Sequence, residues 1–283
     1  MRITRLACTA VLAAFALAAR AQQGVDLLDQ NHSPDFPSWT LYGTATALNS
    51  TPGNGFTYST LDLTRAGTGG QAGAGWAPQT LAMDFNSAFS FRFAFNIHNT
   101  PDQLRGDGLT FVLADATGVG GTGSELGYGG LSSHSVAFAV DTFNFTGEPV
   151  SPSVQILTGG SSTPVAYTET GLGNSVRNAQ YALIGTLSYA PSGHGDNAGT
   201  LTGKIWNPDL GSFSVQAPVD FAALALAGVP VYYGFTAANG LATDGHTIQW
   251  GAPAAAVPEP GSWAMILAGL ACLGLIARRR RAR

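Results

Sequence analysis

Phenylalanine occupies every second position from Phe89 to Phe95, and this run constrains the fold more than any other feature of the chain. The residues between the rings are Ser90, Arg92 and Ala94. A period of two places alternate side chains on opposite faces of a β-strand. We therefore expect one face of this strand to supply the aromatic core of a β-sandwich.

Seven further runs have the composition of β-strands, and clusters of Gly, Asn, Asp, Ser and Pro, the residues that turns require, separate them. No segment outside the two chain ends has a convincing helical period, and residues 219–227 are at most a short helical turn. Regularly spaced strands with turns between them predict an all-β, antiparallel sandwich. The runs cover residues 109–113, 135–142, 153–157, 181–189, 199–205, 230–236 and 246–250.

The first 21 residues are predicted to be a secretory signal peptide. Arg2 and Arg5 precede an apolar run over residues 6–19, and Ala19-Arg20-Ala21 provides a small-x-small cleavage site. Signal peptides have this order of charged, apolar and small residues, and they are removed from the mature protein. We therefore expect the chain to be exported, with a helix at this end only in the segment that is cleaved.

The C-terminal segment contains a helix breaker, an apolar stretch and a cluster of cations, in that order. Pro258-Glu259-Pro260 precedes the apolar residues 262–277, and five arginines lie within residues 278–283. The prolines set a boundary before a helix, and the apolar stretch is near the ~17-residue lower limit for a single membrane helix. Five arginines favour the cytoplasmic side of the membrane. Residues 257–283 resemble the PEP-CTERM sorting tail of Gram-negative bacteria that export exopolysaccharide.

This resemblance implies a route out of the cell. In that family a membrane protease, exosortase, cuts near the Pro-Glu-Pro motif, so the helix is a transient inner-membrane anchor before the protein reaches the cell surface or the medium. Residues 252–256 form a short Ala/Pro spacer before the motif. Residues 22–251 contain no linker, charge run or repeat, and we expect them to form one domain.

The exported part, residues 22–256, is acidic and lacks cysteine. Cys8 and Cys272 lie in the two processed ends, so the exported part has neither a disulfide framework nor a thiolate metal site. It carries five basic residues and 16 acidic ones, which gives a formal charge of −11. Surfaces that bind nucleic acid cluster Lys and Arg against the phosphates. The charge therefore excludes nucleic acid as a partner.

Five motifs in order, within residues 36–250, resemble those of the legume-type (L-type) lectins. Residues 106–113, Gly-Asp-Gly-Leu-Thr-Phe-Val-Leu, are similar to the Asp-Gly strand of that family. Residues 126–130 and 135–143 resemble its glycine loop and its metal strand, and residues 70–76 and 219–237 resemble its early Gln-x-Gly-x-x-Trp turn and a late strand segment. The resemblance implies a concanavalin-like jelly roll, with a flat back sheet, a curved front sheet and sugar-binding loops.

The same resemblance assigns a sugar site to three loops. Asp107, which follows Gly106 through a cis peptide bond in the family, accepts hydrogen bonds from two sugar hydroxyls, and an ionised carboxylate is a strong acceptor. We expect this carboxylate at the rim of a concave sheet, open to ligands. Tyr128 is a candidate to stack on a sugar ring, and the alternative is a tyrosine that packs in its loop with its hydroxyl in water. The residues expected at the sugar are Gly106, Asp107, Ser124, Glu125, Tyr128, Asn144, Ala242, Thr243 and Asp244.

The metal strand departs from the family pattern. Ala139 stands in place of a Glu ligand, and Ser153 lies about where a His ligand should be, so no transition metal is expected. An oxygen-only calcium site formed by Asp141, Phe143 through its carbonyl, Asn144 and Glu148 is one hypothesis, because calcium prefers oxygen ligands. The alternative is that these are ordinary turn residues at a strand end.

Enzyme signatures do not fit the chain. Residues 118–123 satisfy G-x-G-x-x-G, but no helical period follows to meet a pyrophosphate. The β-glucanases of the laminarinase type share the fold class, yet Glu125, Glu148 and Glu169 lack the close carboxylate spacing of their catalytic strand. No G-x-S-x-G or H-E-x-x-H is present, and the five histidines are expected in solvated turns.

We expect an exported, non-catalytic protein that binds a surface or matrix polysaccharide. A structural or adhesive matrix protein that keeps the sandwich without binding sugar is the second hypothesis, and Ala139 in the eroded metal strand favours it. A glycoside hydrolase ranks last.

Overall fold

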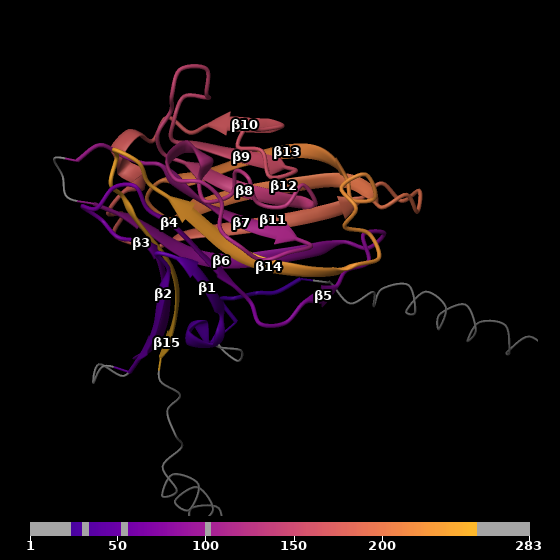
Figure 1. The fold of residues 1–283 in the computed structure, drawn as a ribbon, viewed down its shortest axis with the longest axis horizontal. Helices are drawn as coiled ribbons and strands as arrows, with labels where there is room; N and C mark the ends of the chain where they lie inside the picture. Colours follow the sequence, from indigo (N-terminus) through magenta and orange to yellow (C-terminus); the bar gives the residue numbers. More distant parts are fainter. Residues whose placement is uncertain (1–23, 30–33, 52–55, 100–102, 254–283) are drawn as a thin grey trace, which may run out of the picture. The chain divides into compact units, whose positions relative to one another are not determined.

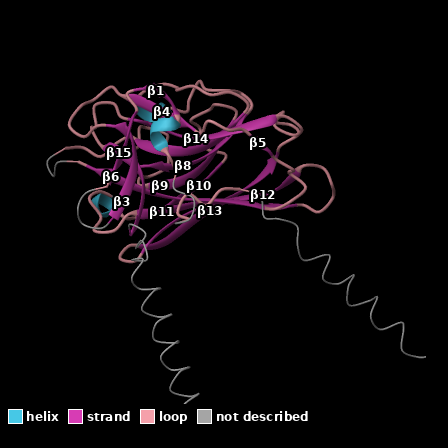
Figure 2. Cartoon of the chain, turned by 90° about the horizontal axis from the view of Figure 1, so that it is seen from below, coloured by secondary structure: helices cyan, strands magenta, loops and turns pink. Residues whose placement is uncertain are grey.

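The computed structural model describes residues 24–29, 34–51, 56–99 and 103–253. The predicted signal peptide, residues 1–21, and the predicted membrane helix, residues 262–277, lie outside these residues, as does the motif Pro258-Glu259-Pro260. Within the described ranges no helix is long and apolar enough to cross a membrane. Three single-turn 3-10 helices are described, at Phe36–Ser38, Gly123–Glu125 and Gly173–Val176 (Figure 2).

The rest of the ordered structure is two antiparallel sheets, which confirms the predicted all-β sandwich (Figure 1). In the eight-stranded sheet the order is β1-β4-β14-β7-β8-β9-β10, with β5 paired to β14. Its strands are β1 (Thr40–Gly43), β4 (Ala72–Trp76), β5 (Leu81–Ala82), β7 (Gly108–Ala114), β8 (Ser135–Asp141), β9 (Ser153–Thr158), β10 (Ala166–Glu169) and β14 (Pro230–Ala238).

The seven-stranded sheet has the order β13-β12-β11-β6-β15-β3-β2. The phenylalanine run forms β6 near its middle, with β11 on one side and β15 on the other. The strands of this sheet are β2 (Thr46–Ser50), β3 (Phe56–Thr64), β6 (Phe89–His98), β11 (Leu183–Pro191), β12 (Ala198–Asn207), β13 (Gly211–Asp220) and β15 (Gly245–Pro253).

Chain contacts divide the molecule into two units. The larger one, residues 1–50 and 58–251, contains nearly all of the described strand residues. The smaller one comprises residues 51–57 and 252–283, of which only short stretches are described. The boundaries predicted for the mature domain, residues 22–251, stay a prediction.

The phenylalanine run supplies the core, as its period of two predicts. Phe89, Phe91, Phe93 and Phe95 are each at most 1% exposed. The Phe93 ring stacks on Phe111 of β7 with the ring centres 5.3 Å apart, so β6 of one sheet contacts the other sheet through its aromatic face. Burying a phenylalanine stabilises a fold by about 1.5–3 kcal/mol, and this row is therefore a principal source of stability.

A second apolar cluster lies against the eight-stranded sheet. Leu126 and Tyr128 of the glycine-rich loop pack with Trp76 and Val112, and all four are at most 1% exposed. The Trp76 Nε1 donates a hydrogen bond to the Gly118 carbonyl at 2.7 Å, which ties the start of the loop to β4. All seven residues of β7 are buried, and the same is true of β8, because these strands lie under apolar layers on both faces.

Seven strands were not foreseen from the sequence: β1 to β5, β10 and β13. Strand β13 has alternating exposure, and Pro218, a residue that is rare in strands, stands at one of its exposed positions. Pro218 is tolerated because β13 is the edge of its sheet, where a strand can lack one N–H donor. The segment after it, residues 221–225, is a turn rather than a helix.

Candidate functional site at Asp107

Asp107 lies in the turn that leads into β7, at the end of the sandwich where β14 and β8 also have loops. The Gly106–Asp107 peptide bond is cis, as the resemblance to the L-type lectins implies. The Asp107 N–H donates to the Ala238 carbonyl at 3.0 Å, and the Asp107 carbonyl accepts from the Thr142 N–H at 2.7 Å. The two strands that flank β7 therefore fix the backbone of this residue.

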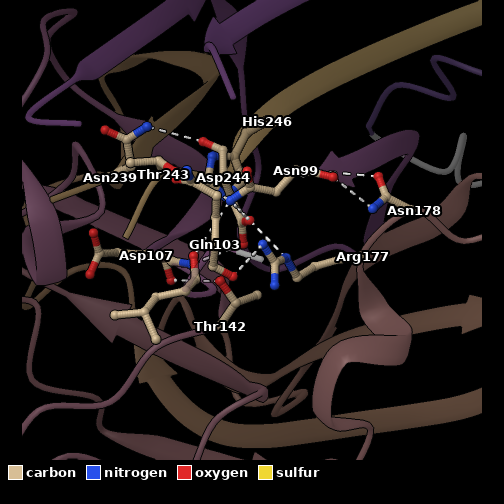
Figure 3. A network of polar contacts seen from close by, with 12 residues as sticks. Asn99, Gln103, Asp107, Thr142, Arg177, Asn178, Asn239, Thr243, Asp244 and His246 are labelled. Atoms are coloured by element: carbon tan, nitrogen blue, oxygen red, sulfur yellow. Dashed lines mark hydrogen bonds and ion pairs between the residues drawn. The ribbon is translucent and has the colours of Figure 1, made fainter. Parts of the chain in front are cut away.

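The Asp107 carboxylate is buried, which corrects the expectation of an open rim position. The residue is 2% exposed, and its Oδ2 atom has no hydrogen-bond partner. Burial raises the pKa of Asp107 to about 6, against a lowering effect of the nearby Gly240 N–H, while Glu148 and Asp244 add repulsion. In Figure 3 the carboxylate points away from the other labelled side chains, and no dashed line reaches it.

Two glycines, Gly106 and Gly240, lie close to this carboxylate. A methyl group added at Gly240 would approach Asp107 Oδ2 to 3.2 Å and the Gly123 Cα to 3.4 Å. A methyl group at Gly106 would lie 2.6 Å from Ala242 Cβ and 2.9 Å from the Phe143 Cβ. A side chain at Gly106 would therefore collide with its neighbours, and one at Gly240 would crowd the Asp107 carboxylate.

Tyr128 and Glu125, which lie in or beside the glycine-rich loop at residues 123–130, do not point toward a ligand as predicted. Tyr128 is fully buried, and its hydroxyl contacts Ser135 Oγ at 2.9 Å and the Gly160 N–H at 3.1 Å. The prediction that this ring stacks on a sugar is therefore wrong, and so is the alternative of a hydroxyl in water. Glu125 folds back on its own loop, because its side chain fills the space beside Gly129 and Gly121. Ser124 is partly exposed next to Gly123.

In the last loop, the residues expected at the sugar are buried below the surface. Ala242 is 2% exposed, Thr243 is 9% exposed and Asp244 is fully buried, whereas Leu241 is 97% exposed. The sequence prediction therefore selected the inner residues of this loop and missed the one that projects into solvent. The sequence of this short loop does not indicate that Leu241 is exposed while the residues after it are buried.

Asp244 holds a buried polar network together (Figure 3). Its Oδ2 accepts the Gly106 N–H at 2.8 Å, and its Oδ1 accepts the Asn99 side-chain amide at 2.8 Å. Arg177 Nε lies 2.8 Å from Oδ1, an ion-pair distance, although its N–H is not directed along that line. Burial raises the pKa of Asp244, and these three donors oppose the rise.

Asn239 links the last loop to the early Gln-x-Gly-x-x-Trp turn. Its side chain accepts the Gln71 N–H at 3.0 Å and donates to the carbonyls of Thr68 and Asp244. His246, two residues beyond Asp244, is fully buried and its Nδ1 contacts Thr64 Oγ1 at 2.7 Å. The prediction of a solvated turn histidine is wrong here, and burial lowers the pKa of His246 to about 3, which keeps the ring neutral.

The metal strand ends beside this site, and its donors do not fit a transition metal. Ala139 is paired with Gln155 on β9, and Ser153 stands next to Gln155 on the same strand. The Gln155 side-chain amide donates to Asp141 Oδ2 at 2.9 Å and contacts Ser153 Oγ at 2.9 Å. An amide N–H₂ group has no lone pair for a metal. It therefore occupies a coordination direction of Asp141 that a cation would need.

The oxygen groups of the calcium hypothesis are also engaged with donors. Asp141 Oδ1 accepts the Phe143 N–H at 3.0 Å, Glu148 accepts the Phe145 N–H at 2.6 Å, and the exposed Asn144 is 3.3 Å from Ser151 Oγ. Burial raises the pKa of Asp141 to about 8, with a further raising effect of Glu148 and Asp107. Among the described residues no three His, Cys, Asp or Glu side chains are grouped to hold a metal ion. This arrangement does not fit the predicted calcium set.

The C-terminal segment and the fold were compared with known proteins. Residues 256–281 match the family model of the PEP-CTERM protein-sorting motif, which confirms the sorting tail. This match indicates a secreted protein that carries a C-terminal sorting signal. The curated proteins give no match to the chain.

Three solved structures illustrate the fold. The basic winged bean lectin with Tn-antigen is 22% identical, with a TM-score of 0.56 over 74% of this chain and 97% of that chain. Lectin I-B4 from Griffonia simplicifolia, in a metal-free form, is 20% identical, with a TM-score of 0.58 over 78% and 95%. The exoplasmic/lumenal domain of VIP36, in a Ca²⁺/Man-bound form, is 17% identical, with a TM-score of 0.51 over 76% and 82%. The chain has the fold of the L-type lectins and ends in a PEP-CTERM sorting motif.

Proposed function

We propose that this chain is an exported, non-catalytic carbohydrate-binding protein of the cell envelope or the exopolysaccharide matrix. The observation that carries the proposal is Asp107 Oδ2, a buried acceptor without a hydrogen-bond partner that lies beside Gly240. A buried polar atom without a partner costs free energy, and a sugar hydroxyl would supply the missing hydrogen bond. The solved structures of this fold include a lectin with Tn-antigen and a domain with bound Man.

The ligand reaches Asp107 only if the last loop moves. Asp107 is 2% exposed, and Gly240 and the exposed Leu241 lie in the loop that borders it. An outward shift of Gly240 and Leu241 would let a hydroxyl enter. It breaks the hydrogen bond from the Gly70 N–H to the Gly240 carbonyl and leaves the buried Asn239 in place, and loops open at lower free-energy cost than core strands. The other parts of the proposal are processing by an exosortase-type protease and release to the cell surface or the medium.

A glycan array with the full chain, kept soluble by a mild detergent, tests the proposal. We expect retention on at least one neutral or acidic polysaccharide and its loss in Asp107→Asn, which removes the charge while keeping the shape of the side chain. Glu169→Gln, the same carboxylate-to-amide change at an exposed position in β10, should retain binding. Retention that survives Asp107→Asn would place the site elsewhere.

A structural or adhesive matrix protein is the second candidate function. The observation that favours it is the burial of Asp107 itself, since a buried carboxylate is not accessible to a sugar in solvent. No glycan bound on the array, together with a full-length protein that incorporates into the matrix, would support this candidate against the first. A glycoside hydrolase remains the last hypothesis, because Glu125, Glu148 and Glu169 lack the close spacing of a catalytic pair, and it requires release of products from a polysaccharide.

A further inference from the structure

Asp107 is connected to a buried ion pair through the peptide group that precedes it. The Gly106 N–H donates to Asp244 Oδ2 at 2.8 Å, and the Gly106 carbonyl accepts the Asp244 N–H at 3.0 Å. Gly106 is thus held at both of its polar groups by one residue of the last loop. Any displacement of Asp244 moves the Gly106–Asp107 peptide, and with it the Asp107 carboxylate.

Arg177 anchors Asp244 from the opposite side. Its side chain is 5% exposed, that of Asp244 is fully buried, and the two charges lie 2.8 Å apart. The guanidinium also donates to the Gln103 carbonyl at 3.1 Å, three residues before Gly106. The ion pair therefore spans the segment that leads into Asp107, and Asn99 adds a third donor from the end of β6.

On the far side of Asp107, a side-chain amide occupies the place where the family pattern predicts a metal. The Thr142 N–H, which fixes the Asp107 carbonyl, follows Asp141 in the chain. Asp141 in turn is held by the Gln155 amide and by the Phe143 N–H. The Asp244 contacts on one side of Asp107 and the Asp141 contacts on the other are therefore formed by protein groups alone.

We propose that Asp107 is positioned by the Arg177–Asp244 ion pair, acting through the Gly106 peptide, and without a metal ion. Asp244 and Arg177 are positioning residues in this scheme, and Gln155 replaces the cation at Asp141. The inference rests on the proposed function, because it states how the sugar-binding carboxylate is placed. It also predicts that glycan binding is insensitive to chelators, in contrast to a site built on a metal.

Hydrogen–deuterium exchange of the full chain in mild detergent tests the proposal without any ligand. We expect the amides of residues 104–108 to exchange at the same rate, within about twofold, with EDTA or with excess calcium or manganese. In Arg177→Met the same amides should exchange at least about tenfold faster, since the Gly106 N–H loses a fixed charged acceptor. Arg177→Lys keeps the charge and should give an intermediate rate.

The matched control is Arg92→Met. Arg92 forms an exposed ion pair with Asp26, at 3.2 Å, so the change removes the same charge away from Asp107. Exchange at residues 104–108 should not respond to it. If Arg177→Met fails to fold, the double variant Arg177→Met/Asp244→Asn removes both charges and keeps an amide oxygen to accept the Gly106 N–H. We expect it to fold and to exchange several-fold faster than the parent at residues 104–108.

Three results would overturn the inference. The first is faster amide exchange at residues 104–108 when EDTA is added, and the second is slower exchange there when calcium is added. The third is an exchange rate at these residues in folded Arg177→Met that equals the rate in the parent. Retention on a polysaccharide is measured in parallel. A chain that binds no glycan but shows the expected exchange pattern removes the proposed function and leaves the positioning role. A chain that binds glycan only when metal is present keeps the proposed function and removes the positioning role.

Discussion

Asp107 and Asp244 are two buried carboxylates on neighbouring loops, and they differ in what surrounds them. Asp244 is fully buried, accepts hydrogen bonds from Gly106 and Asn99, and forms an ion pair with Arg177. Asp107 is 2% exposed, has an Oδ2 atom without a partner, and faces repulsion from Asp244 and Glu148. The Asp244 carboxylate stabilises the fold through its partners, whereas the ionised Asp107 carboxylate lowers the free energy of unfolding.

The two environments identify Asp107, and not Asp244, as the candidate ligand group. A buried acid with several donors is explained by stability alone, because each charged hydrogen bond contributes about 1.5–3 kcal/mol. A buried acid with one oxygen left without a partner costs free energy when it is ionised, which makes it a candidate for a functional group. Sequence motifs placed both residues at the sugar, and only the hydrogen-bond partners separate them.

The variant that breaks the buried Arg177–Asp244 ion pair should change stability the most. Arg177→Met should lower the free energy of unfolding by about 3–5 kcal/mol, because it leaves Asp244 as a buried charge without its partner. Urea unfolding followed by circular dichroism measures this. An effect below about 1 kcal/mol would contradict the view of Asp244 as a structural acid. The exposed pair Arg92–Asp26 serves as reference and should contribute about 0–1 kcal/mol.

Removal of the unsatisfied carboxylate should have opposite effects on binding and stability. Asp107→Asn should weaken glycan binding by about 100-fold, as two charged hydrogen bonds are replaced by neutral ones. The same variant should be more stable than the parent at pH 7, by about 1–3 kcal/mol, since burial raises the pKa of Asp107 to about 6. Parallel affinity and unfolding measurements check both. Loss of stability in this variant would mean that Asp107 is a structural acid like Asp244.

The difference in free energy of unfolding between the parent and Asp107→Asn should depend on pH. The pKa of Asp107 is about 6 in the folded chain and about 3.8 in the unfolded chain, so the folded chain keeps its proton to higher pH. Raising the pH from 4 to 6 therefore lowers the stability of the parent relative to Asp107→Asn, and the gap is constant above about pH 7. Glycan binding should follow the opposite trend and weaken as the pH falls through about 6. Stability curves of the two proteins that run parallel over this range would count against the raised pKa.

The smallest effect is expected at Leu241. Its side chain is 97% exposed, so Leu241→Ser should change the free energy of unfolding by less than about 0.5 kcal/mol. Because it follows Gly240, which borders Asp107, the same change should alter which glycans are retained. An array profile identical to that of the parent would exclude this loop tip from the ligand surface.

The fold could be predicted from the sequence because its signals are local. The alternation of Phe89 to Phe95 and the strand at residues 109–113 carry their own period or composition, and both are strands of the core. The cis Gly106–Asp107 bond also agrees with the resemblance to the L-type lectins. Strands such as β10 and β13 were missed because they are short or contain Pro218, so their pairing depends on neighbours distant in the sequence.

The site was predicted less well because burial and partners are properties of the assembled fold. Tyr128 stands in a glycine loop, a position typical of exposed aromatics, yet it packs against Ser135 and Gly160. Arg177 and Gln155 were missed altogether, since nothing in their local sequence connects them to Asp244 or Asp141. Pairing β8 with β9 in the correct register places the polar Gln155 opposite Ala139, and this pairing is the signal that could have identified Gln155.

The small apolar cluster under the glycine-rich loop has a consequence for how this protein can diverge. Leu126, Tyr128 and Trp76 anchor the loop independently of the aromatic core between the sheets. The tip beyond that anchor, residues 122–124, is partly or fully exposed. Substitutions at Thr122 and Ser124 therefore leave the anchor and the sandwich in place, and a lineage can acquire new contact chemistry at these two positions. Gly123 between them has a φ of +65°, so a side chain there would strain the loop.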